Sequence, residues 1–103
     1  MNRKTNPSEL YILSLAKGIP GVIARLSTAE EDCGYHKADV VVNFGGNVYY
    51  FQVSHTEKSK GERERLARRG THPIATHKHP SMPHPEKDLV DSISGAINLS
   101  NPN

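Results

Sequence analysis

The chain has 103 residues, with 13 Lys and Arg, 11 Asp and Glu, 6 His and a formal net charge of +2. This length accommodates one domain and excludes two independent hydrophobic cores. No apolar run approaches the ~20 residues of a membrane-spanning helix, and a single Cys33 excludes an internal disulfide framework. Because the N-terminus also lacks the apolar stretch of a signal peptide, we expect a small cytoplasmic domain that is not associated with a membrane.

The first third of the chain predicts a helix, a short strand and a loop. Residues 7–9 (PSE) are typical of a helix start, and apolar residues follow up to Gly18. Residues 21–27 (GVIARLS) are rich in β-branched side chains and predict a strand. We interpret the polar residues 28–37 as a loop.

A β-hairpin is the strongest secondary-structure signal in the chain. Residues 38–44 (ADVVVNF) predict a strand, and its three consecutive valines indicate burial on both faces. The Gly45-Gly46 pair is typical of a tight turn, and residues 48–55 (VYYFQVSH) predict the returning strand.

The second half of the chain predicts a helix, a strand and a second helix. The charged residues 58–69 favour a helix that ends before Gly70, and residues 73–77 (PIATH) a short strand. Three prolines in residues 78–85 argue against regular structure there, and residues 88–99 have an amphipathic helical period. We therefore expect one domain, 1–103, with a core at about 7–78, a Pro- and His-rich connector at 79–87 and a C-terminal helix at 88–100.

The hairpin turn decides which polar side chains meet. A two-residue turn at Gly45-Gly46 sets Asp39 directly opposite Gln52, whereas a turn shifted by one residue sets it opposite Ser54. Gln52 and Ser54 are two residues apart, so they share one face of the sheet in either register. Asp and Gln oxygens are ligands suited to Mg²⁺, but the same pair is also explained by hydrogen bonding at a strand edge.

The hairpin residues resemble the PD-(D/E)XK nuclease superfamily. The resemblance lies in residues 37–42 (KADVVV), the glycine turn and residues 49–54 (YYFQVS), and it extends over about residues 7–78. It implies an α/β (α+β) restriction-endonuclease-like core of helix, three-strand meander, helix and strand, with a mixed sheet flanked by helices. Glu9 matches the first-helix acid of branches similar to archaeal Holliday-junction resolvases and RecB-type nucleases.

The resemblance implies a nuclease that hydrolyses phosphodiester bonds in DNA with Mg²⁺ or Mn²⁺. The implied metal ligands are Glu9, Asp39, Gln52 and the Val53 carbonyl. The family lysine falls on Ser54, so the resemblance implies that a lysine just beyond the strand replaces it. The implied catalytic residues are thus Glu9, Asp39, Gln52 and Lys58, with Lys60 as a second candidate for the lysine, and cleavage of both strands of a duplex by so small a domain implies a homodimer.

Two other functions remain open. Ser54 at the lysine position is also expected of an inactive nuclease-like scaffold that binds nucleic acid or a protein partner. A small structural module, in which Asp39 and Gln52 only cap the hairpin, is the third interpretation.

Cations concentrate directly after the hairpin. They form either a phosphate-binding surface for DNA or a solvated helix face with internal ion pairs. The candidate nucleic-acid-binding residues are Lys58, Lys60, Arg63, Arg65, Arg68 and Arg69. The prolines among the histidines 72, 77, 79 and 84 favour a polar connector over a zinc site.

Overall fold

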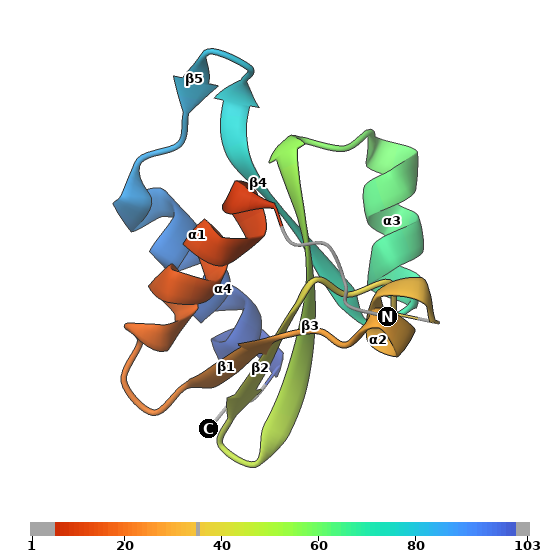
Figure 1. Cartoon of the computed structure of the whole chain (residues 1–103), viewed down its shortest axis with the longest axis vertical. Coiled ribbons are helices and arrows are strands. Elements are labelled where there is room, and N and C mark those ends of the chain that lie inside the picture. Colours follow the sequence, from red (N-terminus) through yellow and green to blue (C-terminus); the bar gives the residue numbers. More distant parts are fainter. Residues whose placement is uncertain (1–5, 35, 101–103) are drawn as a thin grey trace.

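The computed structural model describes residues 6–34 and 36–100. Within them the chain forms one five-stranded mixed sheet with four helices around it (Figure 1). In chain order the elements are α1 (Pro7–Lys17), β1 (Ile23–Leu26), α2 (Ala29–Cys33), β2 (Val40–Phe44), β3 (Asn47–Thr56), α3 (Lys60–Arg68), β4 (Thr71–His79), β5 (Met82–Pro83) and α4 (Glu86–Ser100).

The strands lie in the sheet in chain order, from β1 to β5. The first three form an antiparallel meander, and β4 then pairs parallel with β3. A parallel neighbour requires a crossover, which α3 provides, and the short β5 returns antiparallel beside β4. Figure 1 shows α1 and α4 together on one side of the sheet and α3 on the other. The mixed α/β class expected from the sequence is therefore confirmed.

The predicted hairpin is confirmed, and it has the first of the two registers considered from the sequence. Phe44 pairs with Asn47, so the turn consists of Gly45 and Gly46 alone. Both glycines have a positive φ, 59° and 82°, which a tight hairpin turn of this hand requires. The valines at 40–42 are fully buried, as their run predicted.

The predicted helices begin at side-chain caps. Asn6 accepts a hydrogen bond from the Glu9 backbone N–H at 2.9 Å, and Pro7 follows it as the first helical residue. Ser59 accepts from the Glu62 N–H at 3.3 Å and begins α3 two residues later than expected.

One hydrophobic core lies between the sheet and the helices α1 and α4. Phe51 of β3 is 2% exposed and is among the largest buried side chains. Helix α4 contributes Leu89, Ile93 and Ile97, which are four residues apart and share one helix face. The core therefore continues beyond residue 78, where the sequence analysis ended it, and into the C-terminal helix.

Two segments expected to be irregular contain regular structure. Residues 28–37 were predicted to be a loop, but a capping box at Thr28 allows the short helix α2 to form there. In the expected connector, β5 pairs with β4 through Met82 and Pro83, because an edge strand tolerates a proline whose missing N–H would face solvent.

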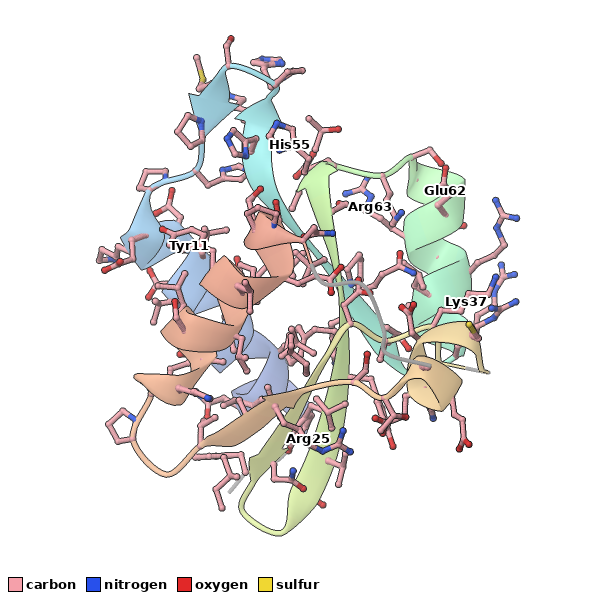
Figure 2. All side chains as sticks on the ribbon, in the orientation of Figure 1. Tyr11, Arg25, Lys37, His55, Glu62 and Arg63 are labelled. Carbon is pink, nitrogen blue, oxygen red and sulfur yellow. The ribbon has the colours of Figure 1, made fainter. Side chains whose placement is uncertain are left out.

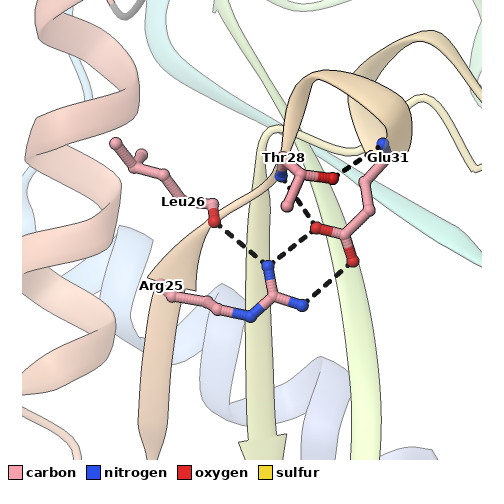
Figure 3. A network of polar contacts seen from close by, with 4 residues as sticks. All are labelled: Arg25, Leu26, Thr28 and Glu31. Atoms are coloured by element: carbon pink, nitrogen blue, oxygen red, sulfur yellow. Dashed lines mark hydrogen bonds and ion pairs between the residues drawn. The ribbon is translucent and has the colours of Figure 1, made fainter. Parts of the chain in front are cut away.

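A polar network holds α2 against β1 (Figure 3). The Arg25 guanidinium donates to both carboxylate oxygens of Glu31, at 2.7 and 3.0 Å. Glu31 also accepts from the Thr28 backbone N–H, while the Thr28 hydroxyl accepts from the Glu31 N–H. The hydrogen bonds from Arg25 lower the pKa of Glu31 to about 2.

We expect Thr28→Ala to lower the free energy of unfolding by about 1 kcal/mol, because the Glu31 N–H loses its cap. Thr28→Ser keeps the hydroxyl and should restore most of that stability. Urea unfolding of the two variants measures the difference. Equal stability of Ala and Ser at this position would show that the cap does not stabilise α2.

Candidate functional site

Asp39 lies where the hairpin ladder ends. The last residue pair is Val40 with Phe51, and the Asp39 backbone N–H donates to the Phe51 carbonyl at 2.8 Å. The Asp39 carboxylate, rather than a backbone carbonyl, accepts the Val53 N–H at 2.7 Å. The N–H and C=O of one strand residue point to the same side, so the Val53 carbonyl lies on this edge of β3 as well.

The Asp39 side chain is 7% exposed, and its pKa is raised from 3.8 to about 6. Burial is the largest cause, and the hydrogen bond from Val53 opposes it. A hydrogen bond between the carboxyl groups of Asp32 and Asp39, and the negative charges of Glu9 and Asp32, raise the pKa further. Acidic side chains from α1, α2 and the start of the hairpin therefore lie close together.

Glu9 reaches this acidic cluster, which consists of Glu9, Asp32 and Asp39, from the first turn of α1. Its side chain is 6% exposed, and Asn6 donates to its carboxylate at 2.8 Å. Asn6 thus caps the helix and also orients the Glu9 carboxylate. Glu9 and Asp39 were predicted from the sequence to share one site, and in the structure the Glu9 charge is close enough to raise the Asp39 pKa.

Gln52 connects the hairpin to the residue before Ala38. Its side-chain amide donates to the Lys37 carbonyl at 3.1 Å. Together with the bond from Val53 to Asp39, this contact holds residues 37–39 against residues 52–53. Lys37 has a φ of 52°, in the left-handed region that costs a side chain with a Cβ about 1–2 kcal/mol. Its backbone N–H donates to Gly34 at 3.3 Å.

A cavity of about 320 Å³ opens beside Gln52, between residue 37 and helix α3. Figure 2 shows Lys37 at the C-terminal end of α3. Among the described residues that line the cavity, four are cations and one, Glu62, is a carboxylate, whose oxygen lies 3.8 Å from the Lys58 Nζ. The lining residues are Lys37, Gln52, Lys58, Glu62, Arg65, Leu66 and Arg69; we call this space the basic cavity.

The structure divides the six predicted nucleic-acid-binding cations into two groups. Lys58, Arg65 and Arg69 line the basic cavity. Lys58 precedes α3, while Arg65 within the helix and Arg69 at its C-cap are four residues apart and share one helix face. Lys60, Arg63 and Arg68 are not among the lining residues. Ser54 occupies the position where the family lysine was expected. Its hydroxyl donates a hydrogen bond to the Thr56 carbonyl at 2.7 Å.

His36 holds the same segment from the other side. Its ring stacks on Tyr50, with centroids 3.9 Å apart, and its Nδ1 lies 2.6 Å from the Arg69 carbonyl. The Thr71 hydroxyl donates to the His36 carbonyl at 2.6 Å. These contacts connect the start of the hairpin to the end of α3 and fix one wall of the basic cavity.

The histidines considered for a zinc site do not converge. His77 stacks on His55, with centroids 3.9 Å apart, while His72 lies beside Phe51 of the core. In residues 6–34 and 36–100, no three His, Cys, Asp or Glu side chains are placed so that they could hold a metal ion. The implied ligand set of Gln52 and the Val53 carbonyl contains groups outside those four residue types.

Asp32, Lys37 and His36 were missed by the sequence analysis. The spacing of Thr28 and Glu31 is a capping-box signal for the short helix that carries Asp32. Nothing local in the sequence indicates the left-handed conformation of Lys37 or the stacking of His36.

Comparisons of the chain with protein-family models, with curated proteins and with solved structures give no match in any of the three. In the described part of the chain, no helix has the length and apolar character needed to cross a membrane.

Proposed function

We propose that the chain is a small divalent-metal-dependent nuclease that hydrolyses phosphodiester bonds in DNA. The observation that carries the proposal is the pair of contacts that hold residues 37–39 against residues 52–53. This junction has a buried acidic cluster at Asp39 and a cavity lined by cations at Gln52. Apart from the short helix α2, which lies between β1 and β2, the order α1, β1, β2, β3, α3, β4 is also the order that the restriction-endonuclease-like core implies.

The donor atoms at the junction fit Mg²⁺ or Mn²⁺. Carboxylate oxygens of Glu9 and Asp39, the side-chain oxygen of Gln52 and the Val53 carbonyl are all hard oxygen ligands. The raised pKa of Asp39 fits as well, because a cation would offset the burial and the like charges that cause it. When bound, such an ion polarises a phosphate oxygen and activates a water molecule as the nucleophile.

The protein's own residues supply the other requirements of the reaction. Asp39 must lose its proton to bind a cation, so the affinity for Mg²⁺ should rise as the pH increases through about 6. Lys58 lines the same cavity as Gln52, and it lies four residues after Ser54, whose hydroxyl supplies no positive charge. We propose that Lys58 stabilises the charge that develops on the phosphate, and that two copies of the chain cleave the two strands of a duplex.

An inactive scaffold that binds nucleic acid is the second candidate. The observation that favours it is that Gln52 and Ser54 both use their side chains to bind backbone carbonyls, those of Lys37 and Thr56. In that function the basic cavity binds DNA, and the acidic cluster is only structural.

Cleavage of labelled DNA in Mg²⁺, Mn²⁺ or EDTA tests the proposal. We expect the wild-type chain to cleave with either metal and not in EDTA, and Asp39→Asn to bind DNA without cleaving it. Asp88→Asn, which changes an exposed acid on α4, is the matched control and should cleave normally. Binding without metal-dependent cleavage in the wild type would support the scaffold, and absence of both would overturn the two candidates together.

A further inference from the structure

The basic cavity has more positive charge than one internal phosphate of a DNA strand can neutralise. Among the described residues that line it, cations outnumber carboxylates four to one. An internal phosphodiester has one negative charge, whereas a terminal phosphomonoester has about 1.5 to 2 at pH 7. The charge of the cavity is therefore better matched by the end of a strand.

The size of the cavity also suits the end of a strand. A volume of about 320 Å³ is at the lower end of the range of small-ligand pockets, which begins at roughly 300 Å³. Beside the cations, the lining contains Leu66, which is 6% exposed, and Gln52. A phosphate held by the cations would leave an apolar surface and an amide for the sugar and base of one terminal nucleotide.

The cations approach from two elements. Arg65 within α3 and Arg69 at its C-cap are four residues apart and both line the cavity, where their planar guanidinium groups can each donate two hydrogen bonds to phosphate oxygens. Lys37 belongs to the opposite wall, and its backbone is fixed by the bond from Gln52 to its carbonyl. A phosphomonoester offers three terminal oxygens, so donors from both walls can bind it together.

We propose that the basic cavity binds the terminal phosphomonoester of a DNA strand. This proposal rests on the proposed function, because it assumes a nucleic-acid ligand, and it adds a preference for phosphorylated strand ends over internal positions. The wall formed by residue 37 and the wall formed by α3 both contribute to that preference.

The experiment compares three oligonucleotides of one sequence, with a 5′-phosphate, a 3′-phosphate or hydroxyl groups at both ends. Fluorescence anisotropy in EDTA measures binding without cleavage. We expect one phosphorylated end to bind at least about tenfold more tightly than the hydroxyl form, as expected for one or two charge-assisted hydrogen bonds. Inorganic phosphate and a mononucleotide are added as competitors, and the mononucleotide should compete better.

Three variants locate the effect. Arg65→Gln removes a cation from α3, and Lys37→Asn removes one from the opposite wall while Asn tolerates the left-handed backbone. Both should abolish the preference for the phosphorylated end. Lys17→Gln, the control, makes the same charge change at an exposed residue of α1 outside the cavity and should keep the preference.

Each other outcome contradicts the proposal in a distinguishable way. Equal binding of phosphorylated and hydroxyl ends would overturn it and leave the nuclease proposal intact, whereas no binding of any oligonucleotide would overturn both. Competition by inorganic phosphate as strong as by the mononucleotide would assign the cavity to free anions, and tighter binding of a phosphoserine peptide would assign it to a protein partner.

Discussion

Asp39→Asn is expected to stabilise the domain at pH values above about 7, although it replaces a buried residue with two defined hydrogen-bond partners. The side-chain oxygen of Asn can still accept the Val53 N–H, and its NH₂ group can donate to Asp32 without needing a shared proton. The variant therefore keeps the contacts of Asp39 and removes its charge.

The pH dependence of this effect follows from the pKa of Asp39, which is 3.8 as the ordinary value and about 6 in the folded protein. Because the folded state binds the proton more tightly, Asp39 contributes stability below about pH 3.8, and that contribution is lost as the pH rises through about 6. The difference corresponds to at most ~3 kcal/mol, and screening by the surrounding protein and solvent reduces it to about 1–2 kcal/mol.

Urea unfolding at about pH 5 and about pH 8 measures the prediction. Asp39→Asn should match the wild type more closely at the lower pH and exceed its stability at the higher one. Asp39→Ala is the contrasting variant: it leaves the buried Val53 N–H without its acceptor and should cost about 1–3 kcal/mol. If Asn destabilises the domain as much as Ala does, Asp39 is structural and the metal proposal fails.

The effect of Mg²⁺ on the melting temperature of the wild type and Asp39→Asn is an independent test of the metal site. A cation bound by the proposed ligands, Glu9, Asp39, Gln52 and the Val53 carbonyl, stabilises the folded state by RT ln(1 + c/Kd) at a free concentration c, so Mg²⁺ should raise the melting temperature of the wild type at about pH 8. The Asn variant should respond much less. An equal response in both would show that Mg²⁺ binds elsewhere.

The sequence predicted the hairpin because every signal for it is local. The Gly45-Gly46 turn signal and the run of valines predicted the two strands. Of the two registers that remained open, the structure has the one in which Gly45 and Gly46 form the turn. The expected pairing of Asp39 with Gln52 lies one step beyond the observed ladder, whose last pair is Val40 with Phe51. The Asp39 carboxylate accepts the Val53 N–H in place of a backbone carbonyl, and residue spacing could not predict this hydrogen bond.

The acidic cluster and the basic cavity depend on contacts between distant segments. Asp32 meets Asp39 because residues 28–37 fold back as α2, and Lys37 enters the cavity because Gln52 and His36 hold its segment in a left-handed conformation. The backbone preference of lysine does not favour this left-handed conformation. The helix pattern predicted α3 and its charge, but its rotation toward the sheet is decided by the burial of Leu66.

The largest expected effect on DNA binding comes from Arg65 and Arg69 together. Each phosphate contact contributes a slope of about −0.9 to the dependence of log K on log salt for duplex DNA, or about −0.7 for single strands. Loss of two contacts should therefore flatten the slope by up to about 1.8 and weaken binding about 50- to 100-fold near 0.1 M salt. Anisotropy titrations of the Arg65→Ala, Arg69→Ala double variant across salt concentrations measure both quantities.

Two charge-matched double variants separate the cavity from general charge. Lys60→Ala with Arg63→Ala removes two cations of the same helix region that do not line the cavity, and Lys17→Ala with Lys87→Ala removes two from other helices. If phosphates enter the cavity, the salt dependence of binding changes most for the Arg65→Ala, Arg69→Ala variant and least for the Lys17→Ala, Lys87→Ala variant. Equal changes for Arg65 with Arg69 and for Lys60 with Arg63 would mean that DNA binds along the whole helix surface, and an unchanged slope in both would exclude α3 from the interface.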